Sequence, residues 1–268
     1  MESPKLKRDA ITQPQLWRMV MEIGKQTLTV ALFPPTKTES PITETLTLDT
    51  PEKPLVKALE SVIYDNALLL SEFKRIDCLI DTEKFLYVPS TDDEETINLY
   101  FNRVFPDAEE VETSKFSNGE MMIYEAEGEL QSFLKRTFFG IKITHRLSPL
   151  IKYLQNSAKG DEYIVLNENN KGFDIAAFRN GTLLTASSYG IASETDEVYY
   201  LYALKEAFSI IDPKIYLRSS KNRGELSESI LHTYFPSIRP WMTAYDLLQS
   251  GKAYSEIPLT MLATTLCE

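Results

Sequence analysis

The sequence predicts an α/β protein built from two similar lobes in tandem, and three observations carry this prediction. The order strand–strand–strand–helix–strand–helix can be read once near the N-terminus and again from Glu162 onward. Comparable points of the two halves, Glu22 and Asn167, are 145 residues apart (167 − 22), which is too long for a solenoid repeat and fits a duplicated domain. No Ser/Gly-rich linker separates the halves, so we expect them to pack on one another.

The length of 268 residues allows one large domain or two small ones. Residues 1–13 are polar and interrupted by proline, which predicts a loose tail. We expect residues 14–148 to form the N-terminal lobe and residues 149–268 to form the C-terminal lobe.

The first half begins with two strand-like apolar runs joined by a hairpin turn at residues 24–26, followed by an alternating third strand. Pro54 opens an amphipathic helix. A second helix begins with the acid-rich stretch 91–95, which suits the positive end of a helix, and ends before Pro106. The expected strands are 16–23, 27–33, 42–48, 75–80, 85–88, 121–124 and 141–144, and a further helix is expected at 129–138.

The second half begins after a short helix at 149–156 and a turn at 157–161. A tight hairpin is expected at Arg179-Asn180-Gly181, because Asn and Gly accept positive φ at little energetic cost. Pro213 ends a long helix, and Pro258 interrupts two short helical patterns after Ala244. The expected strands are 162–166, 173–178, 182–187, 214–217 and 238–242, and the expected helices are 194–210 and 225–235.

The stretch 166–190, LNENNKGFDIAAFRNGTLLTASSYG, resembles the phosphate-binding hairpin of the actin-like ATPase superfamily. In that superfamily the hairpin looks like D-x-G-G-G-T-T-D-I, followed by an R-N-G or D-G turn and another strand; here Asp174, Ile175 and the turn at 179–181 match. The chain as a whole is most similar to an uncharacterised bacterial domain-of-unknown-function family with that fold. The resemblance implies two ribonuclease H-like lobes around a cleft that in active members holds ATP and Mg²⁺.

The resemblance also shows which parts of a phosphate site have changed. The first loop should read D-x-G-x-x-x-T; Gly24 and Thr27 lie in this loop beside Lys25, but Glu22 replaces the acid, and Gly24 is also what an ordinary hairpin turn requires. The third loop, residues 218–224, lacks the usual Gly pair and reads either as a solvated loop or as an anion site.

In the second loop the glycines that would bring backbone N–H groups to phosphates are missing. Asn167 stands at the position of the leading acid, and the Gly triplet falls on Asn169, Asn170 and Lys171. The candidate residues of a vestigial cleft are therefore Gly24, Lys25, Thr27, Asn167, Asn169, Lys171, Gly172 and Asp174. No catalytic residue and no metal ligand is assigned.

Composition excludes several other classes of protein. The net charge of −11 opposes sequence-independent nucleic-acid binding, and no apolar stretch reaches the length of a membrane span. The only histidines, His145 and His232, and the only cysteines, Cys78 and Cys267, lack zinc spacing. Together with the absence of a secretory signal at the N-terminus, this predicts a cytoplasmic location.

The leading hypothesis is a non-catalytic actin-like protein that needs no cofactor and acts as an interaction or assembly module. Its protein partner is unknown, and a homodimer is left open. One alternative is an ATP-binding kinase or ATPase in which Lys25, Lys171 or Lys221 replaces metal charge. The other is a small-ligand module that uses the same cleft. The aromatic helix segment 198–202 is expected in the core, with a partner surface as the alternative.

Overall fold

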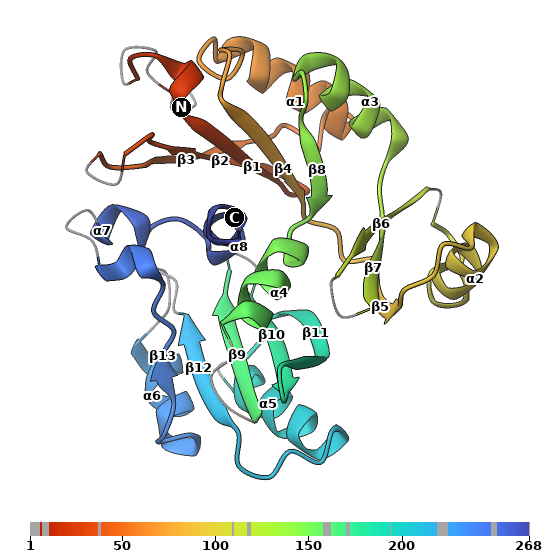
Figure 1. Ribbon diagram of the computed structural model, residues 1–268, viewed down its shortest axis with the longest axis vertical. Coiled ribbons are helices and arrows are strands. Elements are labelled where there is room, and N and C mark those ends of the chain that lie inside the picture. The colour runs from red at the N-terminus through yellow and green to blue at the C-terminus, as the bar shows by residue number, and fades with distance from the viewer. Residues whose placement is uncertain are drawn as a thin grey trace.

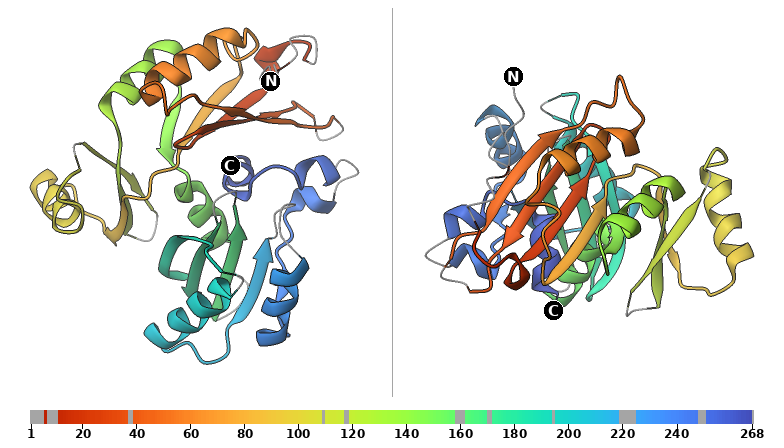
Figure 2. Two further views of the ribbon diagram at one scale, coloured as in Figure 1. Left: turned by 180° about the vertical axis from the view of Figure 1, so that it is seen from behind. Right: turned by 90° about the horizontal axis from the view of Figure 1, so that it is seen from above.

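The computed structural model describes residues 6, 11–36, 39–108, 110–116, 119–157, 162–169, 172–193, 195–218, 225–247 and 251–267. They form two lobes, each centred on a five-stranded sheet, with a small third sheet at one side (Figures 1 and 2).

The N-terminal sheet has the strand order β3-β2-β1-β4-β8. Strands β1 to β3 are antiparallel neighbours, whereas β4 and β8 run parallel to β1. One face of the sheet packs against two helices, whose apolar stripes make a buried core with it. The elements are β1 (Arg18–Ile23), β2 (Thr27–Phe33), β3 (Ile42–Thr47), α1 (Leu55–Asp65), β4 (Arg75–Ile80), α3 (Gly128–Thr137) and β8 (Lys142–His145).

The same core reaches into the segment 1–13 that the sequence predicts to be a loose tail. Leu6 and Ile11 are buried in it, and residues 1–5 and 7–10 lie outside the described residues, so the loose tail stays a prediction. A short 3-10 turn, η2 (Pro14–Leu16), then leads into β1.

Between β4 and α3 the chain forms an inserted unit with the sheet order β5-β7-β6. Its elements are β5 (Phe85–Pro89), α2 (Glu94–Val104), β6 (Val111–Lys115) and β7 (Glu120–Glu125). Helix α2 begins at an Asp93 cap, whose carboxylate accepts from the Thr96 N–H at 3.2 Å. Figure 2 shows the unit projecting from the side of the molecule.

This insertion corrects two expectations. Helix α2 belongs to the insertion, and α3 is the helix that completes the N-terminal core, so the two halves match in a different way from the one read off the sequence. Strand β6 was also not predicted, because its five residues include Glu112 and Lys115 and have no apolar run.

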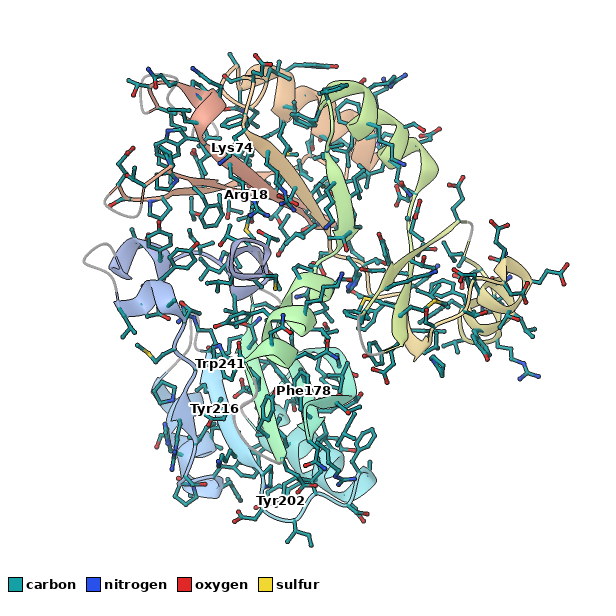
Figure 3. All side chains as sticks on the ribbon, viewed as in Figure 1. Arg18, Lys74, Phe178, Tyr202, Tyr216 and Trp241 are labelled. Carbon is teal, nitrogen blue, oxygen red and sulfur yellow. The ribbon has the colours of Figure 1, made fainter. Side chains whose placement is uncertain are left out.

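The C-terminal sheet has the strand order β11-β10-β9-β12-β13, with β9 parallel to β12 and antiparallel to β10. Its hairpin turn has the predicted positive φ values, 52° at Asn180 and 79° at Gly181. Trp241 lies edge-on to Tyr216 at 5.3 Å between ring centroids, on the side of the sheet that faces α4 and α8 (Figure 3). The elements are β9 (Glu162–Glu168), β10 (Gly172–Arg179), β11 (Thr182–Gly190), α5 (Asp196–Ala207), β12 (Lys214–Arg218), α6 (Glu225–Tyr234) and β13 (Arg239–Pro240).

Two helices hold the lobes together. Helix α4 (Leu147–Asn156) follows β8 directly, and α8 (Leu259–Leu266) packs against both α4 and β1 after the short η3 (Ala244–Leu247) and α7 (Gly251–Tyr254). Their apolar side chains share one buried cluster with residues of both five-stranded sheets, such as Val20 and Val165. Arg18, labelled in Figure 3, pairs with Asp77 at 2.8 Å and donates to the Thr264 carbonyl at 2.8 Å, which fixes α8 beneath the N-terminal sheet.

Candidate functional site

The carboxyl ends of the parallel strands of both lobes point toward the middle of the molecule. In Figure 1 the arrow of β8 points down from the upper lobe and that of β12 points up from the lower one. Polar residues at such strand ends form the usual ligand sites of α/β proteins. Here the strand ends contribute Glu22 from β1, Asn167 from β9 and, just after β4, Asp81.

The centre of this region is the side chain of Arg146, at the junction of β8 and α4. Its Nε donates to Asp81 Oδ1 at 2.7 Å, so it holds the N-terminal lobe. Its two terminal nitrogens donate to Asp174 Oδ2 and Oδ1 at 2.8 and 2.6 Å, and one of them also reaches Ser188 Oγ at 3.0 Å. This bidentate geometry is that of a strong guanidinium–carboxylate pair. The guanidinium therefore links the two lobes.

Asp174 on β10 is the buried acceptor at this link. Besides Arg146, its carboxylate accepts from Asn167 Nδ2 at 2.9 Å, Asn169 Nδ2 at 3.1 Å and Ser188 Oγ at 2.8 Å. Its oxygens are thus directed at groups of the protein itself.

Electrostatics support full ionisation of the pair. Burial alone would raise the pKa of Asp174, but the Arg146 charge and the surrounding donors hold it below its ordinary value. Burial likewise opposes the charge of Arg146, yet Asp174 and Asp81 keep its pKa above the ordinary value. Burial raises the pKa of the nearby Glu22 carboxyl, against the Arg146 charge and a hydrogen bond from Thr260.

The first predicted loop is a closed hairpin turn. The Gly24 N–H donates to the Thr27 carbonyl at 2.9 Å, and Thr27 begins β2. Glu22 accepts from Thr260 Oγ1 of α8 at 2.6 Å. Lys25 is exposed and pairs with Glu83 at 3.0 Å.

The second loop is closed by its own side chain. Asn169 Oδ1 accepts from the Gly172 N–H at 2.9 Å, while its Nδ2 binds Asp174. A Cβ at Gly172 would lie 2.0 Å from the Tyr189 carbonyl oxygen, so the glycine is required by the close approach of β11. Lys171, and Lys221 of the third loop, lie outside the described residues.

The structure thus brings three of the predicted residues, Asn167, Asn169 and Asp174, into direct contact. Phe173, which follows Gly172 on β10, is buried in the core on the other side of the C-terminal sheet, against Tyr189 and Tyr200. It does not fill the space between the lobes.

Sequence reasoning missed Arg146, Asp81 and Ser188. Asp81 did give a signal, because it directly follows an apolar strand run at the edge where ligand residues gather. Arg146 gave none, since an arginine after a strand is ordinary and its partner Asp174 is 28 residues away.

His145, next to Arg146, is fully buried and neutral. Its Nε2 lies 3.1 Å from the Thr82 carbonyl, and its Nδ1 accepts from the Leu147 N–H at 3.2 Å. These contacts require a proton on Nε2 and none on Nδ1. Burial lowers its pKa from 6.5 to about 4.

Within the described part of the chain, no three His, Cys, Asp or Glu side chains form a group that could hold a metal ion. Over the same residues, no helix combines the length and apolar character that a bilayer crossing requires.

Comparison with known proteins places this geometry in a fold. Over residues 7–238 the chain matches the family model described as a protein of unknown function (DUF3822). No curated protein matches the chain by sequence.

Two solved structures resemble the chain over nearly all its length. One is a protein with actin-like ATPase fold and unknown function from Bacteroides thetaiotaomicron, with 17% identity, a TM-score of 0.78 and coverage of 96% of this chain and 98% of that one. The other is from the PilM-PilN type IV pilus biogenesis complex, with 13% identity, a TM-score of 0.56 and coverage of 95% and 100%. The predicted fold class is confirmed, and the chain belongs to the DUF3822 family and has the actin-like ATPase fold.

Proposed function

We propose that this protein is a non-catalytic member of the actin-like ATPase fold that acts as a protein-interaction or assembly module in the cytoplasm. The single observation that carries the proposal is the position of Arg146. A guanidinium of the chain itself occupies the point between Asp81 and Asp174 where the two lobes meet.

The charges around Arg146 support this reading. The carboxyl groups of Glu22, Asp81 and Asp174 surround one guanidinium, so a triphosphate entering here would meet more carboxyl groups than cations. Four donor bonds of Arg146 already go to protein oxygens, which leaves little capacity for a phosphate. An incoming nucleotide would have to break a buried ion pair.

The second loop also supports a non-catalytic role. Asn167 stands where the family resemblance calls for an acid that holds a metal-bound water, and its amide is committed to Asp174. The Asn169 side chain folds over the turn and takes the Gly172 N–H that a phosphate would need.

The alternative of an ATP-binding enzyme gains no support from Lys25, because its ammonium group pairs with Glu83 at the surface. What supports an interaction role is that Arg146 and a shared apolar cluster join both lobes, while the second loop lacks the glycines of a phosphate site. In the similar PilM-PilN structure a protein of this fold is part of a complex, which fits an assembly role for this chain too.

Calorimetric titration of the full chain with Mg-ATP and with Mg-ADP tests the proposal. We expect no binding heat and no shift in melting temperature at 1 mM nucleotide, with an active actin-like ATPase as positive control. A site with a Kd one hundredfold below the nucleotide concentration would stabilise the fold by about 2.7 kcal/mol, which is easily detected. Saturable nucleotide binding with hydrolysis would contradict the proposal in favour of the enzyme, and saturable binding without turnover would favour a ligand-binding module.

A further inference from the structure

The three sheets present six edge strands, and these differ in how they are protected. Edge strands leave backbone N–H and C=O groups unpaired, and proteins commonly guard them with charged side chains. Four of the edges carry such a charge: Glu44 on β3, Lys142 on β8, Lys115 on β6 and Arg239 on β13. The other two edges, β5 and β11, have none along their lengths of five and nine residues.

These two edges without a charged residue, of which β5 ends in Pro89, line the same groove. It has a volume of about 390 Å³, and its walls are the β5 residues 85–87, the β11 residues 184–189 and Glu83. Figure 1 shows β5 of the inserted unit and β11 of the C-terminal lobe on the same side of the molecule. The groove thus lies between two sheets that each end there.

Both faces of β5 are covered, so its edge is what it presents to the groove. Phe85 and Tyr87 pack against the core shared by the lobes, whereas Leu86 and Val88 pack under α2. Among the residues that the structure describes, β5 pairs with β7 alone, and β11 pairs with β10 alone. A backbone lying between them could form ladders on both sides, as in strand addition to an exposed sheet edge.

The residues that line the groove also limit which peptide segments can bind there. Among the described lining residues, Glu83 carries a charge, which Lys25 balances at 3.0 Å, and the remaining nine are apolar or carry hydroxyl groups. The whole chain has a net charge of −11, so an acidic segment would be repelled. Uncharged residues flanked by Lys or Arg are therefore complementary to the groove.

At one end the groove meets the aromatic segment singled out in the sequence. Tyr189 of the lining stacks on Tyr200 with ring centroids 3.9 Å apart, and Tyr199, which is 67% exposed, lies edge-on to Tyr200. These rings offer an apolar and cation-binding surface to a side chain that leaves the groove there.

We propose that this groove binds an extended segment of a partner protein, uncharged or basic in character, which adds as one strand between β5 and β11. A strand with both edges free is needed, because a strand inserted here pairs on two sides. Neither β5 nor β11 of a second copy fits, since each already has one edge occupied. The inference rests on the proposed interaction role. It depends on the free edges of β5 and β11 and not on the Arg146 ion pair, although Ser188 of the lining also bonds Arg146 and Asp174, so it can fail while the proposed function stands.

Random nonapeptides displayed on phage and selected against the full chain provide the test. We expect the selected peptides to be rich in β-branched residues, poor in proline, and neutral or basic. Ser187→Lys places a guard charge on the β11 edge and should weaken binding of a selected peptide at least tenfold. The matched control is Thr182→Lys, on the same strand but outside the lining, which should leave binding within twofold.

Backbone methylation of the selected peptide tests the mode of binding without altering the protein. Methylating the amide nitrogens of either the odd or the even positions should weaken binding at least tenfold. Alternate N–H groups of the peptide point to opposite sides, and we expect one set to bond β5 and the other to bond β11. Selection of acidic peptides, selection of none, or binding that ignores both Ser187→Lys and methylation would overturn the inference. Concentration-dependent dimers that Ser187→Lys abolishes would overturn it in favour of a second copy. Nucleotide binding at the interlobe site would leave these outcomes unchanged and would count only against the proposed non-catalytic role.

Discussion

Replacing Arg146 by methionine is expected to destabilise the protein strongly, because the change removes the guanidinium that neutralises a buried carboxylate. Arg146→Met keeps much of the side-chain volume but leaves Asp174 without its two strongest donors, at 2.8 and 2.6 Å. Asp81 is less affected, since its side chain is 13% exposed and water can reach it. The loss therefore arises mainly at Asp174, whose side chain is 3% exposed.

Removing one partner of a buried ion pair typically costs about 3–5 kcal/mol, because a charge remains buried without compensation. The three donors that Asp174 retains, from Asn167, Asn169 and Ser188, place the expected loss near the lower end, at about 3 kcal/mol. For a protein of this size such a loss lowers the melting temperature by roughly 6–12 °C.

A second variant separates the charge from the packing. In Arg146→Met/Asp174→Asn the uncompensated charge is gone, and we expect most of the lost stability to return. The structure allows the exchange, because Asn167 Oδ1 is buried and has no hydrogen-bond partner among the described residues. Rotation of the Asn167 amide would let this oxygen accept from the new amide at position 174.

Urea unfolding followed by circular dichroism measures all three variants, with Lys25→Met as the matched control for an exposed ion pair. The control should change the free energy of unfolding by less than about 1 kcal/mol. A loss below about 1 kcal/mol for Arg146→Met, or a double variant less stable than the single one, would refute the reasoning, since either result means that Asp174 is not held ionised by Arg146.

Three further changes have defined outcomes. His145 is neutral in the fold, with a pKa of about 4 against an ordinary 6.5, so the stability that it contributes is complete above pH 6.5 and is lost as the pH falls toward 4. Between pH 7.5 and 5 the free energy of unfolding should fall by about 2 kcal/mol for this reason. Urea unfolding of His145→Gln should therefore show a flatter pH dependence than that of the parent. Gly172→Ala should lower stability by about 1–3 kcal/mol in thermal unfolding, because the new Cβ meets backbone, whereas Gly128→Ala meets only the end of the flexible Glu110 side chain and should be nearly neutral. Arg18→Ala removes the donor to α8 and should speed amide hydrogen exchange in α8 before other helices; equal protection of α8 in parent and variant would contradict this.

The main elements of the fold could be predicted from the sequence where local pattern and tertiary role agree. The apolar runs of β1 and β2, the turn at Asn180 and Gly181, and the resemblance carried by Asp174 all report on the fold directly. The insertion was misread because α2 has strong capping signals of its own, and local signals do not say to which core a helix belongs.

Only part of the candidate site could be predicted from the sequence. Asn167, Asn169 and Asp174 lie on one hairpin, so their proximity follows from strand register. Arg146 and Asp81 reach the same point from other strands, and such long-range pairs leave no local pattern. The sequence could show which phosphate-binding groups are absent, but it could not show which group of the chain lies between the lobes.

The position of α8 beneath the N-terminal sheet has a consequence for folding during synthesis. The face of the N-terminal sheet that carries Val20, Ala31 and Leu79 packs in one cluster with residues of α8, which are synthesised well after the strands of that sheet. After β8 ends at His145, 121 further residues (266 − 145) must be added before α8 is complete. At about 5–20 residues per second this takes roughly 6–24 s, during which the nascent sheet has an uncovered apolar surface that a chaperone could shield.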